Sequence, residues 1–409
     1  MERLVVGIGQ LATLAGPPRA RRGPEMADLG LVSGAAILVR DGKVAAAGRE
    51  EAVRAAASAE AVETDVGGRL VTPGLVDAHT HLAFGGNRAE EFAMRIAGAT
   101  YQEIAAGGGG IASTVRQTRA LGEDALYEAA ASRLQRMHRH GTTTVEAKSG
   151  YGLSLSEELK ILRVYRRLGQ KVSATFLGAH AFPPEFASDH EGYVRLLVEE
   201  MLPAVVAEGL AAWCDIFVEE RYFGAEAARR ILGAAKGLGL KVRMHVDQLS
   251  NGGGAALAAE LGAKTADHLE QTDGDGIAAL LAGDVMPVLL PGSVYALGLD
   301  RYPRAREMVD AGLPVVLATD FNPGSSPMPS LPMAMSLACV HMKLTPAEAL
   351  TACTVNAAHS LDRGDQIGSI EPGKDADFVA WDAGDYRELP YWFGGNLVAQ
   401  TWMAGELLA

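Results

Sequence analysis

The chain has 409 residues, which is long enough for one large domain and a smaller second one. Hydrophobic residues make up 48% of it and charged residues 21%, and no apolar run reaches the roughly 18 residues that span a bilayer, so we expect a soluble globular protein. The net charge of −13 argues against a surface for nucleic acids or anionic membranes, and any anionic ligand would need a local cation.

The cysteines and the N-terminus indicate the cytoplasm. Cys214, Cys339 and Cys353 lie far apart and form no C-x-x-C pair, which is typical of a reducing compartment without a disulfide framework. Residues 1–16 are mildly apolar, but glycines and a glutamine interrupt them, so we expect a strand there and no signal peptide.

Both ends of the chain are rich in predicted strands. Two β-like runs within 35–48 are separated by Asp41-Gly42, a strong hairpin signal. Near the other end, 367–382 and 397–408 are also β-like and contain Pro-Gly and Ala-Gly turns. The sequence therefore predicts a small β-sandwich domain that is built from both chain termini around a continuous central domain.

The middle of the chain alternates short β-branched runs with helical segments such as 157–169 and 225–239. The predicted strands are 75–81, 142–148, 171–180, 213–219, 241–247, 264–269, 284–290 and 314–320. Eight alternations of strand and helix predict a TIM-like (β/α)8 barrel of the α/β class. An open, doubly wound sheet is the alternative, although no G-x-G-x-x-G follows a strand to favour it. The expected domains are 1–66 and 359–409 for the β-sandwich and 67–358 for the barrel.

A glycine-rich segment, residues 105–114, follows the first predicted barrel strand. It lacks the Gly-Lys-Ser/Thr of a phosphate-binding loop, so nucleotide binding is not expected. A lid or hinge around Gly107–Gly110 is one interpretation, and a plain surface loop is the other.

Histidines and an aspartate gather at the predicted strand ends. His79 and His81 close the first barrel strand, and residues i and i+2 of a strand point to the same side. His245, His268 and Asp320 each stand at the C-terminal end of the fifth, sixth or eighth strand, where barrel active sites form. Because imidazole is the commonest transition-metal ligand, this set predicts a metal centre.

The donor set indicates the chemistry. A site made of His79, His81, His245 and Asp320 suits Zn²⁺ or Fe²⁺, and such an ion lowers the pKa of bound water to about 7. His268, which is not needed as a ligand, could transfer protons or stabilise an oxyanion, and Asp320 could carry a proton to a leaving nitrogen. These groups are typical of a hydrolase that acts on a C–N bond.

On these residues the chain resembles the amidohydrolase superfamily. "GLVDAHTH" on the first barrel strand, the single histidines on the fifth and sixth and the aspartate on the eighth are similar to its ligand pattern. "GKVAAAG" and "GSIEPGKDADFVAWD" resemble its accompanying β-sandwich. Within it, "RAEEFAMRIAGATYQEIAAGGGGI", "EAKSGYGLSLSEELKILRV" and "LATDFNPGSSPMPSL" closely resemble the imidazolonepropionase family, and "LGAHAFPPEF" and "HVDQLSNGGGAALAAELGAKTADHLE" agree.

The resemblance implies hydrolysis of 4-imidazolone-5-propanoate to N-formimidoyl-L-glutamate in histidine degradation, one bound Zn²⁺ or Fe ion, and a homodimer. By matching position it implies substrate contacts from Arg88, Tyr151, His180 and Gln248, and product contacts from Asn322, Gly324 and Ser325. Physical reasoning agrees, because an arginine offers a planar fork to the propionate of this anionic substrate. Tyr101 is a further candidate neighbour.

Two departures narrow the mechanism. Many relatives with one metal carry H-x-x-E after the fifth strand, whereas Gln248 stands at that glutamate position and cannot ionise. Proton transfer then falls to Asp320 and His268. The fourth strand, 213–219, has no lysine that could be carboxylated to bridge two metals, and Lys148 after the second strand is better explained as structural or electrostatic. One metal ion is therefore expected.

Two other functions are compatible with parts of this pattern. A deaminase of a heterocyclic amine would release ammonia, and its proton shuttle would favour glutamate at position 248. A silent scaffold on the same fold would have lost one or more ligands, and here the predicted set is complete.

Overall fold

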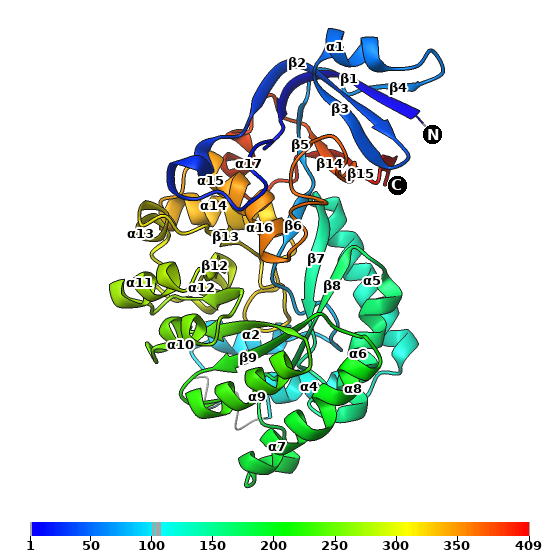
Figure 1. Ribbon diagram of the computed structural model, residues 1–409. Helices are drawn as coiled ribbons and strands as arrows, with labels where there is room; N and C mark the ends of the chain where they lie inside the picture. The colour runs from blue at the N-terminus through cyan, green and yellow to red at the C-terminus, as the bar shows by residue number, and fades with distance from the viewer. Residues whose placement is uncertain (1, 100–102, 104–107, 409) are drawn as a thin grey trace.

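The computed structural model describes residues 2–99, 103 and 108–408, and its larger part is a parallel eight-stranded sheet that curves into a barrel (Figure 1). All eight predicted barrel strands are confirmed. They are β6 (Leu75–Asp77), β7 (Thr142–Lys148), β8 (Val172–Ala179), β9 (Trp213–Val218), β10 (Lys241–Val246), β11 (Thr265–His268), β12 (Met286–Leu289) and β13 (Val316–Leu317). Neighbours in the chain are neighbours in the sheet, from β6 to β13.

The first and last barrel strands meet just beyond their ends. Thr80 and Phe321 form a parallel bridge, and the N–H of His81 donates to the carbonyl of Phe321 at 2.9 Å. The N–H of Asp320 donates to the carbonyl of His79 at 3.1 Å. This contact brings the two ends of the sheet together, so the open doubly wound alternative is wrong.

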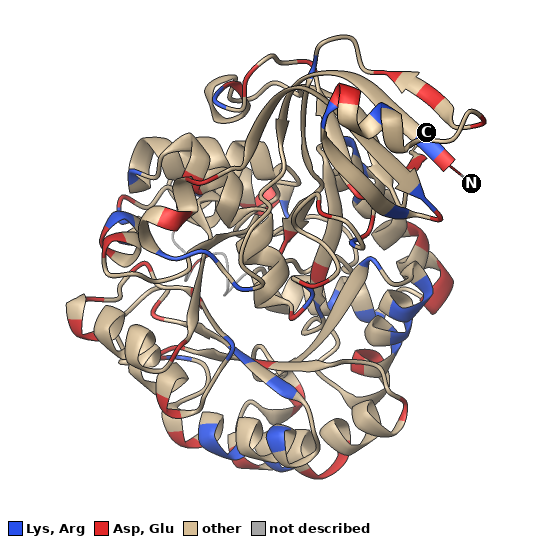
Figure 2. Ribbon diagram, turned by 45° about the horizontal axis from the view of Figure 1, so that its top comes forward, with Lys and Arg blue, Asp and Glu red and all other residues tan. Residues whose placement is uncertain are grey.

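Helices surround the barrel, as the alternating sequence pattern predicts. Following β6 to β13 they are α2 (Ala89–Ile96), α4 (Ile111–Arg119), α5 (Glu123–Arg139), α6 (Leu155–Leu168), α7 (His190–Leu196), a π-helical turn (Leu197–Met201), α8 (Leu202–Ala207), α9 (Ala225–Gly237), α10 (Gly254–Glu260), α11 (Gly274–Ala282), α12 (Pro291–Leu297), α13 (Ala305–Asp310), α14 (Leu331–Met342), α15 (Pro346–Ala352) and α16 (Val355–Ser360). Acidic and basic residues are interspersed over these outer helices (Figure 2).

Helix α6 illustrates why these segments fold as they do. Leu159, Leu162 and Tyr165 recur at helical spacing and are buried, while the two arginines in its last turn stay at the surface. Gly169, with φ of +93°, ends the helix, because only glycine adopts that conformation without strain.

Strands from both chain ends form a second sheet with its own core. Its order is β16-β15-β14-β5-β1-β2-β3, with β4 on β1, and the bounds are β1 (Glu2–Ala12), β2 (Leu31–Arg40), β3 (Lys43–Arg49), β4 (Val62–Asp65), β5 (Leu70–Pro73), β14 (Phe378–Trp381), β15 (Val398–Met403) and β16 (Glu406–Leu407). The hairpin of β2 and β3 turns at Asp41 and Gly42, both with positive φ, as predicted. Short helices α1 (Glu50–Ala56) and α17 (Glu388–Tyr391) accompany this sheet, as do 3-10 turns at Gly23–Ala27 and, beside the barrel, at Pro184–Phe186.

The chain passes from this terminal sheet into the barrel at Gly74, between β5 and β6. A Cβ on Gly74 would lie 2.3 Å from the hydroxyl of Thr143 on β7, so the glycine permits the chain to approach β7 closely. The exact domain bounds, 1–66, 67–358 and 359–409, stay a prediction.

Candidate metal centre and active site

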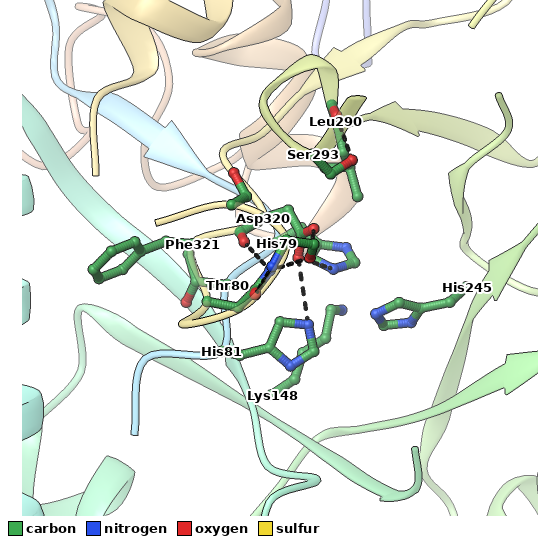
Figure 3. Close-up of polar contacts among 12 residues, drawn as sticks. His79, Thr80, His81, Lys148, His245, Leu290, Ser293, Asp320 and Phe321 are labelled. Carbon is green, nitrogen blue, oxygen red and sulfur yellow. Dashed lines mark hydrogen bonds and ion pairs between the residues drawn. The ribbon is translucent and has the colours of Figure 1, made fainter. Parts of the chain in front are cut away.

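The four predicted ligands converge at the C-terminal end of the barrel (Figure 3). His79 and His81 follow β6, His245 lies in β10, and Asp320 follows β13 with a left-handed φ of +54°. Oδ1 of Asp320 is 3.5 Å from Nε2 of both His79 and His81. The ring centroids of His79 and His245 are 4.5 Å apart, and all four side chains are buried.

The histidine nitrogens suit a metal ion. Nε2 of His79 and of His245 are buried without a hydrogen-bond partner among the described residues. Their Nδ1 atoms are held at 2.6 Å by Asp267 and at 3.1 Å by Asp215, which places the proton on Nδ1 and leaves Nε2 with a lone pair that can bind a metal ion. Burial lowers the pKa of His79, His81 and His245, so the rings are neutral, as ligation requires. These residues fit a single metal ion.

His268 is near these rings but has a different environment. It lies at the end of β11 with a φ of +83°, and its ring centroid is 5.7 Å from that of His79. Nδ1 is 3.3 Å from Oε1 of Glu270, to which the hydroxyl of Ser293 also donates at 3.4 Å. Burial lowers the pKa of His268, but the carboxylates of Glu270, Asp320 and Asp267 together outweigh burial, with Glu270 contributing most, so the net pKa is raised. His268 is thus suited to carry a proton.

The carboxyl group of Asp320 is also suited to proton transfer. Burial raises its pKa to about 6, although the charge of His268 opposes this shift. The Ser325 hydroxyl donates to Oδ2 at 3.3 Å, and Asn322 donates to the backbone carbonyl at 2.7 Å. Oδ1 of Asn322 accepts from the N–H groups of Gly324 and Ser325, each at 2.8 Å, so Asn322 shapes the turn that follows Asp320.

Two predicted substrate-binding residues lie beside the metal ligands. The ring of His180 stacks on that of His81 at 5.0 Å, and Tyr151 lies 5.3 Å from His180. Nδ1 of His180 donates to the carbonyl of Gly150 at 3.0 Å, and burial lowers the pKa of His180 to about 3, so its Nε2 is an acceptor. Glu158 accepts three backbone N–H groups of the loop that carries Tyr151, which fixes this loop.

Arg88 precedes α2 and forms an ion pair with Glu91 at 2.7 Å. Its guanidinium packs against Gly324, where a Cβ would lie 2.0 Å from one of its terminal nitrogens. Burial and then Asp320 raise the pKa of Tyr151, while the charge of Arg88 lowers it. Arg88 is therefore close enough to Tyr151 to interact with it electrostatically. Glu91 also accepts from the N–H of Gly110, the residue before α4, at 3.1 Å.

Gln248 follows β10 and is half-buried. Its side chain forms no hydrogen bond to any residue that the structure describes. Glu219 holds the loop that carries Gln248, because it accepts hydrogen bonds from the N–H of Leu249 at 2.9 Å and from the N–H and hydroxyl of Ser250. Tyr101 and residues 105–107 of the glycine-rich segment, which include Gly107 of the predicted lid or hinge, lie outside the described residues.

Several charged groups of the site were not predicted as functional. Asp215, Asp267 and Glu270 orient the histidines, and Lys148 lies buried among Glu146 and the two aspartates. A carboxylate inside an apolar strand is costly unless it is paired, so "WCDIFV" and "TADH" did contain a signal. No comparable signal existed for Glu270, because it follows the strand in a turn.

Comparisons with known proteins identify the family of the chain. The sequence pattern of the amidohydrolase family matches residues 70–408. The chain is 54% identical over 402 residues to the imidazolonepropionase of Solibacter usitatus, covering 97% of this chain and 96% of that one. It is 48% identical to the imidazolonepropionase of Symbiobacterium thermophilum, covering 100% and 97% of the two chains.

Two solved structures share the fold at low sequence identity. An adenosine deaminase from Xanthomonas campestris with bound zinc has a TM-score of 0.74 at 20% identity, covering 99% of this chain and 92% of that one. The guanine deaminase of E. coli has a TM-score of 0.71 at 16% identity, covering 100% and 99%.

The fold, the histidine cluster and the family match define an amidohydrolase, an enzyme of a metal-dependent hydrolase family. The identity to the curated relatives then places the chain more narrowly: it belongs to the imidazolonepropionases of the amidohydrolase family. No helix in the described part of the chain is long and apolar enough to cross a membrane.

Proposed function

We propose that the chain hydrolyses the ring C–N bond of 4-imidazolone-5-propanoate and releases N-formimidoyl-L-glutamate, a step of histidine degradation. The observation that carries the proposal is the convergence of four buried metal-ligand candidates with a proton-carrying histidine, in a chain 48–54% identical to imidazolonepropionases. A hydrolase of a cyclic amide needs an activated water and a proton for the leaving nitrogen, and these groups can supply both.

His79, His81, His245 and Asp320 would hold one Zn²⁺ or Fe ion. When bound, such an ion makes water acidic enough to supply hydroxide near neutral pH and polarises a carbonyl oxygen. The free Nε2 atoms of His79 and His245 support this assignment. The absence of a lysine from β9 supports a single ion rather than a bridged pair.

The residues of the site also have catalytic and substrate-binding roles. Asp320 accepts a proton from the attacking water and delivers it to the departing ring nitrogen, while the protonated form of His268 donates a hydrogen bond to the oxyanion. Arg88 binds the propionate, and Tyr151 and His180 hydrogen-bond the ring or the same carboxylate. Gln248 offers an amide that can hydrogen-bond the substrate. Asn322, Gly324 and Ser325 contact the product.

The family resemblance also supports a homodimer and a cytoplasmic location. Analytical ultracentrifugation of the purified chain would test the first, with a single species at the mass of two chains as the expected result.

The first test is turnover by the stripped and reloaded protein. Metal-free protein should be inactive towards fresh 4-imidazolone-5-propanoate, and stoichiometric Zn²⁺ or Fe²⁺ should restore loss of the imidazolone absorbance, with formimidoylglutamate identified by mass. The measurement follows absorbance, product mass and metal content on the same sample. A folded, metal-loaded protein without turnover would contradict the proposal, and ammonia release from heterocyclic amines would then favour a deaminase.

A glycine substitution tests the proposed carboxylate site. In Gly324→Ala the new methyl group displaces the guanidinium of Arg88. Loss of its charge-assisted hydrogen bonds to the substrate propionate would cost about 1.5–3 kcal/mol, so KM should rise about 10- to 100-fold. Steady-state kinetics measures the change, with kcat affected less than KM. Gly233→Ala is the matched control, because a Cβ there meets no atom within 4 Å. An unchanged KM for Gly324→Ala would remove Arg88 from propionate binding.

A further inference from the structure

Among the described residues, a group of fully buried charged side chains lies on the barrel strands beside the metal-ligand candidates: Glu146, Lys148, Asp215, Arg243 and Asp267. They come from β7, β9, β10 and β11, whose inward positions would otherwise be filled by apolar packing. Taking such charges out of water is costly, so their retention here calls for a specific role.

Lys148 lies at the centre of this group. Its ammonium is 2.8 Å from Oδ2 of Asp215, 3.0 Å from Oε1 of Glu146 and 3.5 Å from Oδ2 of Asp267. It thus contacts all three buried carboxylates, which stand on three different strands. Figure 3 shows its side chain reaching toward the level of the His81 and His245 rings.

Two of these carboxylates orient metal-ligand candidates. Asp215 uses its other oxygen, Oδ1, to hold Nδ1 of His245 at 3.1 Å. Asp267 uses the same Oδ2 that faces Lys148 to hold Nδ1 of His79 at 2.6 Å. One ammonium group therefore links the hydrogen-bond partners of two histidines on different strands, His79 just after β6 and His245 in β10.

The electrostatic consequence of removing the ammonium follows from these distances. Three carboxylates would share a buried interior with Arg243, whose terminal nitrogens make no hydrogen bond to the described residues. Their mutual repulsion would move the carboxylates apart. Such movement takes Asp215 or Asp267 away from Nδ1 of its histidine, and hydrogen-bond partners of this kind affect metal affinity by about 10- to 100-fold.

We propose that Lys148 is a positioning residue for the metal centre, which sets the rings of His79 and His245 through Asp267 and Asp215. The proposal rests on the metal site of the proposed function. It assigns no contact between Lys148 and the substrate, and it goes beyond the ligands by naming the cation that holds their supporting carboxylates in place.

The test measures metal binding by the apoprotein, without substrate. In Lys148→Met, which keeps the length of the side chain and removes its charge, the Zn²⁺ dissociation constant from chelator competition should rise about 10- to 100-fold. The visible spectrum of the Co²⁺-substituted protein should change, because the histidine geometry changes. Lys148→Arg, which keeps the charge, should recover most of the affinity.

Lys160→Met is the matched control, since Lys160 is a half-buried lysine on α6 that hydrogen-bonds Leu121 and Glu157, and it should bind metal normally. Should Lys148→Met not fold, the double variant Glu146→Gln with Lys148→Met preserves the interior charge and carries the same expectation. A folded variant of either kind, with wild-type affinity and Co²⁺ spectrum, would overturn the proposal. Wild-type protein that binds no metal would instead refute the proposed metal site, and metal-binding protein without turnover would refute the substrate alone.

Discussion

Asp320→Asn is expected to lower kcat by about 10²- to 10⁴-fold, the range typical of losing a general acid–base group. Asparagine retains an oxygen for the metal but can neither take a proton from water nor return one to the ring nitrogen. The pKa of about 6 that burial imposes on Asp320 suits this exchange near neutral pH, and the amide abolishes it. Single-turnover kinetics on samples of known metal content would separate loss of chemistry from loss of metal.

Asp124→Asn provides the control, because the side chain of Asp124 on α5 is 93% exposed and forms an ion pair with Arg167, far from the active site. Its kcat and metal content should match those of the wild type. Full turnover by a metal-replete Asp320→Asn variant would show that the proton passes through another group, and His268 would be the first to examine.

His268→Gln should reduce kcat by about 10²- to 10³-fold with full metal content. Glutamine can still donate a hydrogen bond but carries no positive charge toward the oxyanion, and it cannot release a proton. Because His268 is not among the proposed ligands, metal affinity should stay close to that of the wild type. Metal loss in step with activity would instead make His268 a ligand.

Glu270→Gln tests how the pKa of His268 affects the pH dependence of the reaction. The Glu270 carboxylate raises the pKa of His268, so its removal lowers that pKa, and the protonated ring is then lost at a lower pH than in the wild type. The alkaline limb of the kcat/KM profile should therefore move to lower pH. If the alkaline limb of the kcat/KM profile stays at the same pH, it reflects the titration of a group other than His268.

The barrel and its candidate ligands could be predicted because they depend on local rules. Side chains alternate along a strand, so His79 and His81 had to share a side, and parallel barrel strands all end at one rim, which brings His245 and Asp320 to them. These rules need only the position of each strand end. The roles of the residues remain proposals until the variants are measured.

The supporting charges could not be predicted in the same way. Asp215 and Asp267 act across strand boundaries, so their partners depend on the register of the sheet: His245 stands opposite Asp267, on the neighbouring strand. His268 and Asp320 adopt left-handed backbone angles, which turn their side chains away from the direction that simple alternation gives. Such angles are uncommon for residues other than glycine, and sequence patterns do not reveal them.

The closure of the barrel has a consequence for synthesis of the enzyme. Asp77 binds the hydroxyl of Thr319 at 2.6 Å across a separation of 242 residues, and the bridge between Thr80 and Phe321 follows directly. A nascent chain on the ribosome therefore lacks the proposed carboxylate ligand, Asp320, until nearly four-fifths of the message has been translated. The proposed four-residue metal site would form only after that point, and a product truncated before Asp320 would lack one of its four ligands.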